Sequence, residues 1–231
     1  MVATVAELWC YPVKSLLGEQ LQAAEVDQRG FVGDRLYAIV DRHGKLGSGK
    51  ATRRFRRLAG LFELRARSGP DGPLVTLPDG RELAAGDPDL DGFLSERYAD
   101  ELRVLREGPA SHHDDSPLHL LTTSSLRWLA KKIPTSQIDR RRFRPNVLLD
   151  AAGDELVDDT WVGRRFALGS AEITIVGRTD RCVMTTNAQS ELPKDPKVLR
   201  AVTELNDACL GVFASVEQAG LVRVGDSLRA L

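Results

Sequence analysis

Glu172-Ile-Thr-Ile-Val-Gly-Arg-Thr-Asp-Arg-Cys-Val-Met-Thr-Thr186 is the stretch that decides how this chain folds and where its chemistry lies. Residues 172–176 form a run rich in β-branched side chains, which predicts a strand. The run continues to Cys182, directly after Arg181 and just before two threonines. An adjacent guanidinium favours the thiolate form of cysteine, which is both a nucleophile and a soft metal ligand. We therefore interpret Cys182 as a functional thiolate at the end of a strand.

Short strands separated by Gly, Pro and Asp turns dominate the rest of the sequence. In the first half we predict strands at 4–11, 21–26, 36–41, 61–66, 74–77 and 101–105. In the second half we predict them at 118–121, 146–149, 165–168, 212–216 and 221–228, the last with a tight bend at Gly225-Asp226. This spacing favours barrels over a doubly wound sheet. The predicted fold class is mainly β with some α (α+β), with two strand-rich, barrel-like lobes.

Three helices and one linker complete the predicted organisation. Apolar residues at i, i+3 and i+4 predict a helix over 87–97, hydroxyls at 122–125 cap a second helix that Pro134 stops, and 196–205 forms a third. Residues 108–116 are polar and predict a linker between domains at 1–107 and 117–231. His112-His113-Asp114-Asp115 offers metal-ligand types, but adjacent residues on a linker are expected to form an exposed loop.

Composition limits the classes of partner. The formal net charge of −1 argues against a surface built to bind nucleic acid. The three cysteines stand far apart with no CxxC pair, which is typical of a reducing compartment. No signal peptide and no apolar run of about 20 residues stands out. We therefore expect a cytoplasmic protein with no membrane partner.

Several further motifs have a plain structural interpretation beside a functional one. Gly44–Lys50 imitates a phosphate loop, but Ala51 lacks the magnesium-binding hydroxyl and no helix pattern follows, so a nucleotide hydrolase is not favoured. The role of this loop stays open, including delivery of Lys50 and nearby arginines to an anion. The arginine runs at 53–57 and 140–144 are either solvated faces or phosphate sites. His119, Cys10 and Cys209 lie in apolar surroundings and are interpreted as core residues.

Four segments offer anion-binding groups in addition to Cys182. They are Tyr11-Pro-Val-Lys-Ser15, Gly33-Asp-Arg35, Thr122-Thr-Ser124 and Arg142-Phe-Arg-Pro-Asn146. Each combines cations, hydroxyls or amides with a turn, a helix start or the head of a strand, where anions bind well.

Read in order, these segments and the terminal Val222-Arg-Val-Gly-Asp226 resemble a MOSC-domain protein with an N-terminal MOSC β-barrel domain. The chain is similar to the mitochondrial amidoxime-reducing component family, within the superfamily that includes the C-terminal part of molybdenum cofactor sulfurase. The resemblance covers nearly the whole chain. It implies an N-terminal β-barrel followed by a MOSC β-barrel with peripheral helices.

The resemblance also implies a molybdenum cofactor, Mo-molybdopterin, and a role for each matching residue. Cys182 matches the cysteine that ligates molybdenum. Groups matching those that hold the pterin phosphate are Lys14, Ser15 and Arg35, and groups matching those that line the cofactor are Thr123, Ser124, Arg144, Asn146 and Arg181. A phosphorylated pterin dithiolene is strongly anionic, which suits this set of donors.

The implied activity is reduction of N-hydroxylated compounds, namely hydroxylamines, amidoximes and N-oxides, by a monomer. A separate ferredoxin-like or cytochrome-type protein would supply the electrons. Three alternatives remain open: a sulfur carrier or sulfurase using a Cys182 persulfide, a molybdenum cofactor carrier, and a barrel that binds another phosphorylated ligand. After Thr186 the chain lacks the Asp-x-x-Thr-Gly pattern of many relatives, which indicates a different rim and substrate.

Overall fold

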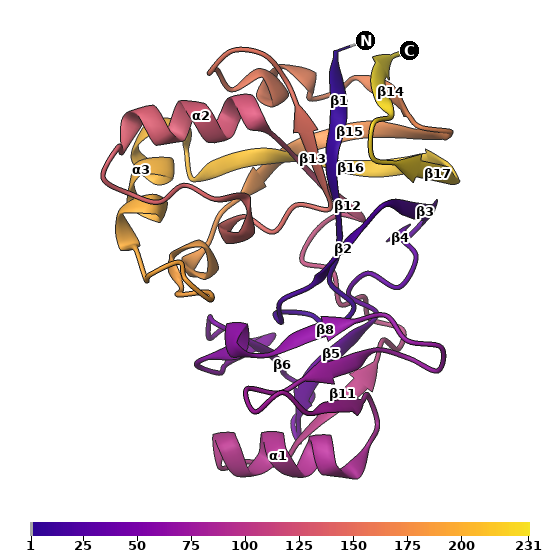
Figure 1. Ribbon diagram of the computed structural model, residues 1–231, viewed down its shortest axis with the longest axis vertical. Coiled ribbons are helices and arrows are strands. Elements are labelled where there is room, and N and C mark those ends of the chain that lie inside the picture. Colours follow the sequence, from indigo (N-terminus) through magenta and orange to yellow (C-terminus); the bar gives the residue numbers. More distant parts are fainter. Residues whose placement is uncertain (1) are drawn as a thin grey trace. The chain divides into compact units, whose positions relative to one another are not determined.

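The computed structural model describes residues 2–231 and divides them into two compact units (Figure 1). Unit 1 contains 2–9, 20–32 and 115–231, and unit 2 contains Cys10–Glu19 and Gly33–Asp114. The chain therefore crosses from one unit to the other more than once. The predicted division into domains at 1–107 and 117–231 refers to sequence modules and stays a prediction.

Unit 1 is built on a closed barrel of seven strands. Their order is β13 (Val147–Asp150), β12 (Leu118–Thr122), β16 (Cys209–Gln218), β15 (Ala171–Asp180), β14 (Arg165–Leu168), β18 (Ser227–Ala230) and β1 (Ala3–Cys10), and β1 pairs back with β13. The pair β12–β13 is parallel and the other barrel pairs are antiparallel. The fold class predicted from sequence is confirmed.

Side-chain alternation gives the barrel two buried faces. Leu118 and Leu120 point into the barrel core, whereas Leu121 belongs to a second apolar cluster on the outer face. The same alternation places Val147 inside and Leu148 outside. The outer cluster is covered by α2 (Thr123–Lys132) and α3 (Pro196–Asn206), which lie side by side (Figure 1). Both faces must be apolar because helices cover the outside.

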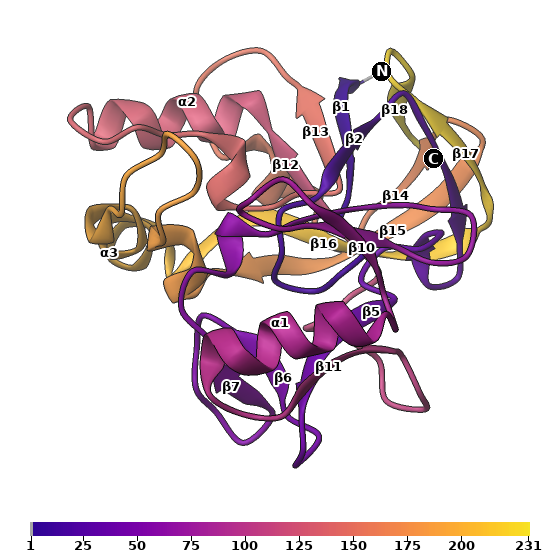
Figure 2. The same ribbon diagram turned by 60° about the horizontal axis from the view of Figure 1, so that its bottom comes forward.

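Three smaller sheets and one short strand complete the two units. In unit 1, β17 (Gly220–Arg223), β3 (Ala23–Asp27) and β4 (Gly30–Phe31) form a sheet, and β2 (Glu19–Leu21) extends the large one. Unit 2 holds β11 (Leu102–Arg106), β5 (Tyr37–Asp41), β6 (Leu46–Ser48) and β7 (Phe55–Arg57) in one sheet, and β10 (Glu82–Ala84), β9 (Leu74–Thr76) and β8 (Arg65–Arg67) in another. Helix α1 (Pro88–Tyr98) packs against β11 (Figure 2).

Each α-helix begins where its sequence predicts. The Asp87 carboxylate accepts a hydrogen bond from Asp89 N at 2.9 Å, and Pro88 fixes the first turn of α1. Thr122 caps α2 by accepting from Ser125 N at 3.0 Å. Asp195 caps α3 by accepting from Lys197 N at 3.0 Å.

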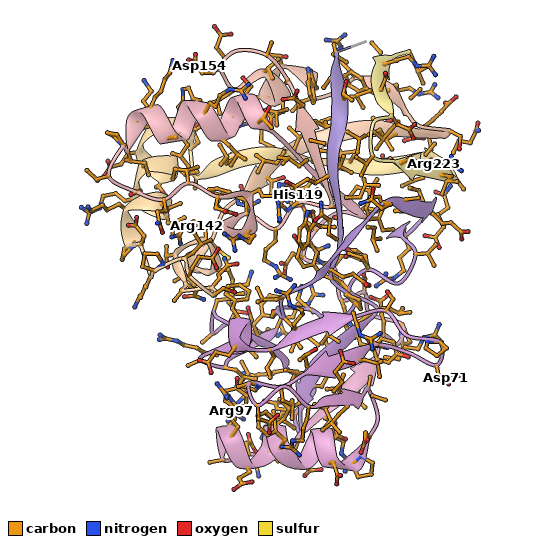
Figure 3. The ribbon with its side chains drawn as sticks, viewed as in Figure 1. Asp71, Arg97, His119, Arg142, Asp154 and Arg223 are labelled. Atoms are coloured by element: carbon orange, nitrogen blue, oxygen red, sulfur yellow. The ribbon has the colours of Figure 1, made fainter. Side chains whose placement is uncertain are left out.

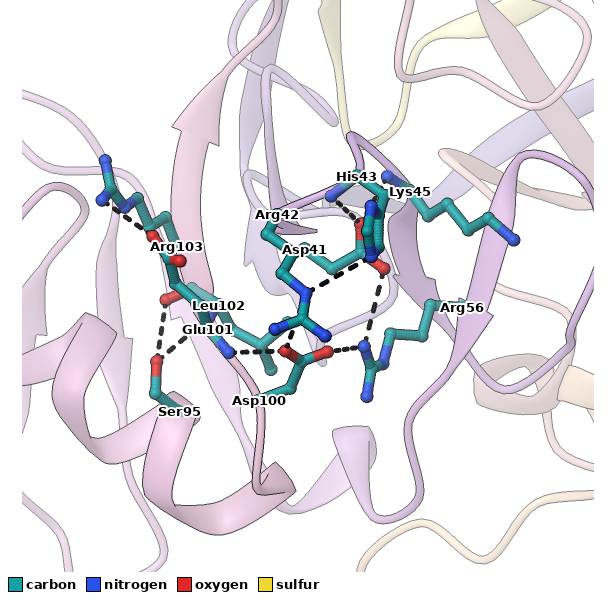
Figure 4. Close-up of polar contacts among 10 residues, drawn as sticks. All are labelled: Asp41, Arg42, His43, Lys45, Arg56, Ser95, Asp100, Glu101, Leu102 and Arg103. Atoms are coloured by element: carbon teal, nitrogen blue, oxygen red, sulfur yellow. Dashed lines mark hydrogen bonds and ion pairs between the residues drawn. The ribbon is translucent and has the colours of Figure 1, made fainter.

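Part of the first arginine run has a structural role in unit 2. Arg56 forms ion pairs with Asp100 and with Asp41, and Arg42 approaches Asp100 at 3.8 Å (Figure 4). The Asp41 carboxylate also accepts hydrogen bonds from His43 N and Lys45 N, both at 2.9 Å. Burial opposes this charge, but the backbone donors and Arg56 keep the pKa of Asp41 below its usual value. Arg56, within this run, therefore stabilises the turn between β5 and β6.

Three sequence predictions need correction. Leu61–Glu63 is a 3₁₀ helix and not the start of a strand, because Gly60 enters the left-handed region at φ 72° and forms a turn with Glu63. Residues 221–228 form two strands in different sheets, although the bend at Gly225, with φ 90°, is confirmed. His112 and His113 are buried, not exposed, because their segment is tied down: the Glu107 carboxylate and the Ser111 hydroxyl accept from their backbone N–H groups, and Arg54 donates to the Ser111 and His113 carbonyls.

The glycine-rich loop is followed by bends and β7, not by a helix, as its sequence predicts. Among residues 2–231, no helix combines the length and the apolar character that crossing a membrane requires.

One buried carboxyl group yields a test of the fold. Asp158, in the 3₁₀ helix Val157–Trp161, accepts a hydrogen bond from the Ser125 hydroxyl, but its Oδ2 is buried without a partner among the described residues. Burial raises the pKa of Asp158 from 3.8 to about 6. The folded chain therefore keeps a proton that the unfolded chain releases above pH 4.

We expect Asp158→Asn to stabilise the protein at pH 8 by up to about 3 kcal/mol and to have little effect at pH 4. The raised folded-state pKa means that the wild type loses stability as pH rises from about 4 to about 6, whereas the amide cannot ionise. Urea unfolding at both pH values checks this. Asp71→Asn, the same change in an exposed turn, serves as the control. An equal gain at both pH values would contradict the assignment.

Candidate functional site

His119 is the centre of a polar cluster in unit 1 (Figure 3). It lies near the start of β12 and is only 5% exposed. Its Nδ1 lies 3.4 Å from the carbonyl oxygen of Arg144, and its Nε2 lies 3.3 Å from Nη1 of Arg181. Gly211 leaves room for the ring, since a Cβ there would stand 2.5 Å from Nε2. The interpretation of His119 as a hydrogen-bonded core residue agrees with these contacts.

The partners of His119 define which nitrogen carries its proton. A guanidinium can only donate, so Nε2 accepts from Arg181, and a carbonyl can only accept, so Nδ1 donates to Arg144. His119 thereby holds Arg181 in place, and Arg181 also donates to the carbonyl of Phe143. The imidazole thus links Arg181 to the backbone of Arg144 through its two ring nitrogens.

Asn146 ties three strands together at the same place. Its Oδ1 accepts from His119 N at 3.2 Å, and its Nδ2 donates to the carbonyl of Trp9 at 3.2 Å. Its own backbone N–H donates to His119 O, while Trp9 N donates to Asn146 O, both at 2.8 Å. The predicted residues Arg144, Asn146 and Arg181 are thus brought together, with His119 as the member that sequence reasoning missed.

Cys182 follows Arg181 and is the N-cap of the 3₁₀ helix Val183–Thr186. Its carbonyl accepts from both the backbone N–H and the hydroxyl of Thr185, at 3.0 and 2.9 Å. All three cysteines are free; Cys10 and Cys209 are buried, whereas Cys182 is partly exposed. Burial raises the pKa of the Cys10 thiol and that of Cys209, which makes both poor nucleophiles.

Backbone conformation also distinguishes three of the predicted residues. Ser15, Arg35 and Arg144 have φ of 68°, 51° and 55°, in the left-handed region that residues other than glycine rarely adopt. Of the other non-glycine residues with positive φ, Ala99 and Asp207 end helices, where this conformation is common. Such outliers concentrate at binding sites because the surrounding structure must hold them in place.

Thr123 and Ser124 lie at the other end of β12. The strand rises by about 3.3 Å per residue, so about 10 Å separate the Cα atoms of His119 and Thr122. The Thr123 hydroxyl donates to Asp150 at 2.8 Å, and the Ser124 hydroxyl donates to the carbonyl of Glu155 at 2.7 Å. The structure does not bring these hydroxyls to the His119 cluster, and their role in cofactor binding stays a prediction.

The predicted residues of unit 2 form a separate cationic group. Lys14 is 5% exposed at its side chain, and its Nζ lies 3.1 Å from Asp114. Burial is the largest influence on this ammonium and lowers the pKa of Lys14 to about 8. Arg35 pairs with Asp34, and the pair raises the pKa of Arg35 despite its burial. Asp114 was not predicted, because a residue 100 positions away in the chain gives no local signal.

Phe55 gathers further cations in unit 2. The Nζ atoms of Lys14 and Lys50 lie 5.3 and 4.5 Å from the centre of its ring, and the guanidinium of Arg54 lies 5.3 Å away. The Arg54 guanidinium also donates to carbonyls of Ser111 and His113. The glycine-rich loop therefore delivers Lys50 next to Lys14, which is the arrangement left open by the sequence.

A barrel with a thiol and an arginine at the end of one strand, and a family model, together define the class of this protein. The model described as the MOSC domain matches residues 107–229, and the one described as the MOSC N-terminal beta barrel domain matches residues 2–85. The first match covers more than half of the chain. The chain belongs to the MOSC domain family, and the resemblance inferred from its motifs is confirmed.

Similar proteins with curated names fall into two groups. Mitochondrial amidoxime reducing component 2 of Homo sapiens is 24% identical over 282 residues, which span 97% of this chain and 82% of the relative. The Bos taurus protein of the same name is 23% identical with the same coverage. Molybdenum cofactor sulfurase of Caenorhabditis briggsae is 23% identical over 98% of this chain, which matches only 36% of that protein.

A solved structure supports the fold. The YUAD protein from Bacillus subtilis superposes with a TM-score of 0.56 at 18% identity, over 99% of this chain and 94% of that one.

The pKa of Lys14 predicts how anion binding in unit 2 depends on pH. With cofactor-free protein, we expect the stabilisation by sulfate to weaken by up to about tenfold in apparent affinity between pH 7 and pH 9, because the ammonium loses its proton above pH 8. Sulfate keeps its charge over this range. Thermal unfolding at graded sulfate concentrations measures the effect.

Lys14→Arg should abolish this pH dependence because a guanidinium stays charged at pH 9. Lys131→Arg, the same change on exposed α2, should leave it as in the wild type. If Lys14→Arg loses sulfate affinity as steeply as the wild type, Lys14 does not bind the anion.

Proposed function

We propose that this chain is a molybdenum-cofactor-dependent oxidoreductase that reduces N-hydroxylated compounds with electrons from a separate protein. The substrates would be hydroxylamines, amidoximes or N-oxides, and the donor a ferredoxin-like or cytochrome-type protein. The named amidoxime reducing components among its relatives support this choice. The activity in the names of these relatives is proposed here for this chain.

The observation that carries the proposal is the environment of Cys182. It is the partly exposed thiol of the chain, and it follows an arginine held rigidly by His119 and by a carbonyl. Arg181 is therefore fixed in the free protein, one residue before the thiol. A partly exposed sulfur ligand that follows a fixed guanidinium suits a soft metal that carries an anionic ligand.

Each unit holds residues of the types that such a cofactor needs. Among residues 2–231, no group of three His, Cys, Asp or Glu could hold a metal ion, so a metal at Cys182 would take its other ligands from the cofactor. Lys14, Ser15 and Arg35 would hold its phosphate, and Arg144, Asn146 and Arg181 would line it. Three of these six have the left-handed backbone that turns N–H groups toward an anion. Thr123 and Ser124 are retained as predicted contacts on the resemblance alone.

The net reaction consumes two electrons and two protons and removes the oxygen atom of an N–OH or N-oxide group as water. The bound cofactor would supply the redox chemistry. Cys182 would anchor the metal and tune it, and would not attack the substrate. Arg181, fixed by His119, would keep the anionic cofactor oriented. The two protons would come from solvent.

A sulfur carrier or sulfurase is the second candidate, favoured by the relative named molybdenum cofactor sulfurase. Cys182 would then bear a persulfide, which needs the same accessible thiol but no metal. A cofactor carrier would bind the same group without turnover. Mass spectrometry of Cys182 after incubation with a sulfur donor detects the persulfide and separates the first alternative from the oxidoreductase.

Metal content and activity test the proposal together. Protein made in a host that synthesises the cofactor should contain near-stoichiometric molybdenum and pterin, and should reduce an amidoxime with a viologen radical as artificial donor. Elemental analysis and product chromatography provide the measurements. Protein without molybdenum would exclude both the oxidoreductase and the carrier, and loaded but inactive protein would leave the carrier.

We expect Cys182→Ser to retain most of the pterin but to lose at least about 100-fold in reductase activity, because it removes the protein's bond to the metal while the cationic contacts stay. Cys209→Ser is the matched control. Its thiol lies 3.4 Å from Asp180, which can accept from a serine hydroxyl equally well. Full activity of Cys182→Ser would refute the ligand assignment.

A further inference from the structure

Asp114 is a carboxylate that stands against the cations of unit 2 at their solvent side. Its Oδ1 lies 3.1 Å from Nζ of Lys14 and 3.8 Å from Nζ of Lys50. Among residues 2–231, neither lysine pairs with any other carboxylate. The exposed fraction of the side chain rises from 5% at Lys14 to 27% at Lys50 and 56% at Asp114. Asp114 is therefore the outermost member of this group.

The cations around Phe55 carry more charge than Asp114 cancels. The ammonium groups of Lys14 and Lys50 and the guanidinium of Arg54 all approach the ring of Phe55. Arg54 bonds to carbonyl oxygens, which leave its charge uncancelled. Three cations around this ring thus face one carboxylate. A phosphate monoester, which carries about −1.5 to −2 at pH 7, cancels more of this charge than a carboxylate does.

The chain is held just before Asp114, whereas the Asp114 side chain is held by the two lysines alone. Arg54 donates to the carbonyls of Ser111 and His113, which fixes the preceding segment. In the part of the chain that the structure describes, the carboxylate of Asp114 has no partner besides the two ammonium groups. Rotation of one half-exposed side chain therefore uncovers both cations without unfolding the segment.

We propose that Asp114 is a placeholder anion, which occupies Lys14 and Lys50 in the free protein and yields them to a phosphate monoester. Lys50, which the glycine-rich loop supplies and the resemblance does not assign, then becomes a second cation for the phosphate. The exchange involves no covalent step, because one anion replaces another on the same ammonium groups. The proposed cofactor and a free phosphate monoester share this chemistry, and the inference rests on the proposed function only where it names the first source.

Removal of the placeholder should strengthen anion binding. A site that is closed for about nine-tenths of the time binds its ligand about tenfold more weakly than an open one. We therefore expect Asp114→Asn to bind phenyl phosphate about tenfold more tightly than the wild type, by calorimetric titration of cofactor-free protein. Asp115→Asn removes the same charge from the next residue, which is exposed. This control should change the affinity by less than about twofold, because exposed charges are screened.

Lys50 is tested by a second pair of variants. We expect Lys50→Gln to weaken the binding of phenyl phosphate by about tenfold or more, the effect of losing one charge-assisted hydrogen bond. Lys45→Gln is the matched control, since this side chain is exposed near the start of the same loop. It should bind like the wild type. Thermal unfolding without ligand verifies that each variant is folded.

A zero-length cross-link separates displacement of Asp114 from a simple effect of its charge. A carbodiimide joins a carboxylate to an amine that it contacts, so cofactor-free wild type should form an amide bond between Asp114 and Lys14 or Lys50. Peptide mass spectrometry locates this bond. Sulfate, which does not react with the carbodiimide, should slow its formation at concentrations that saturate the site. If the carboxylate only repels the anion from an unchanged position, the cross-link forms at the same rate.

Cofactor-loaded protein identifies the source of the phosphate. If the cofactor's own phosphate takes the site, loaded protein forms the cross-link slowly and does not bind phenyl phosphate. If a free phosphate monoester is the ligand, loaded protein forms the cross-link and binds phenyl phosphate as the cofactor-free protein does. Either result supports the exchange.

Three results would overturn the inference. They are a cross-link whose rate of formation is unaffected by saturating sulfate, an equal affinity of Asp114→Asn and wild type for phenyl phosphate, and the absence of binding by both. None of these depends on molybdenum or on reductase activity. Protein that shows the exchange but contains no molybdenum when made in a cofactor-producing host refutes the proposed function and leaves this inference in place.

Discussion

Closure of the barrel in unit 1 by pairing of β1 with β13 is the constraint on which the rest of that unit depends. The pairing is antiparallel and brings the carboxyl end of β1 to the head of β13. Asn146 stands at that head and bonds to Trp9 on β1 and to His119 on β12. Because one amide joins three strands, the position of His119, and through it that of Arg181, is set by the closure itself. Cys182 follows Arg181 directly, so its backbone is held at the same place.

The arginines are held mostly by carbonyl oxygens and not by carboxylates in the part of unit 1 next to Cys182. Arg142 donates to three carbonyls, and Arg181 donates to a carbonyl and to a neutral imidazole. Carbonyl partners satisfy the N–H groups but leave the charge uncancelled. Arg140 and Arg141, farther along the same run, pair with Glu7 and Glu191. The run is therefore divided into Arg140 and Arg141, which pair with carboxylates, and Arg142, which is buried and bonded to carbonyls.

In unit 2 the cations are held by a carboxylate and an aromatic ring instead of by carbonyls. Lys14 and Lys50 share the carboxylate of Asp114, at 3.1 and 3.8 Å, and both ammonium groups approach the ring of Phe55. The Asp114 charge lowers the cost of keeping several cations together while no other anion is bound. Burial and the positive neighbours keep the pKa of Lys14 low, so its charge is less secure than that of an arginine.

Local signals determined what the sequence could predict. The caps at Asp87, Thr122 and Asp195 marked three helices because a cap acts on residues two or three positions away. Leu61–Glu63 was assigned to a strand because an apolar run does not separate a strand from a 3₁₀ turn. The order of motifs gave the family, but contacts such as His119 with Arg181 depend on strand pairing across the barrel.

Family membership leaves the activity open, because the barrel strands fix the positions of the site residues while the loops differ between members. Strands β12, β13, β15 and β16 fix the ends at which Arg144, Arg181 and Cys182 stand, and a barrel of this kind serves any chemistry that needs those groups in place. What distinguishes one member from another lies in the segments between strands, where side chains are free to vary without opening the barrel. In this chain the segment after Cys182 is fixed by a buried arginine at both ends and departs from the pattern of many relatives in between. Its backbone is therefore held by Arg142, which donates to the carbonyls of Thr185 and Pro193 at its two ends.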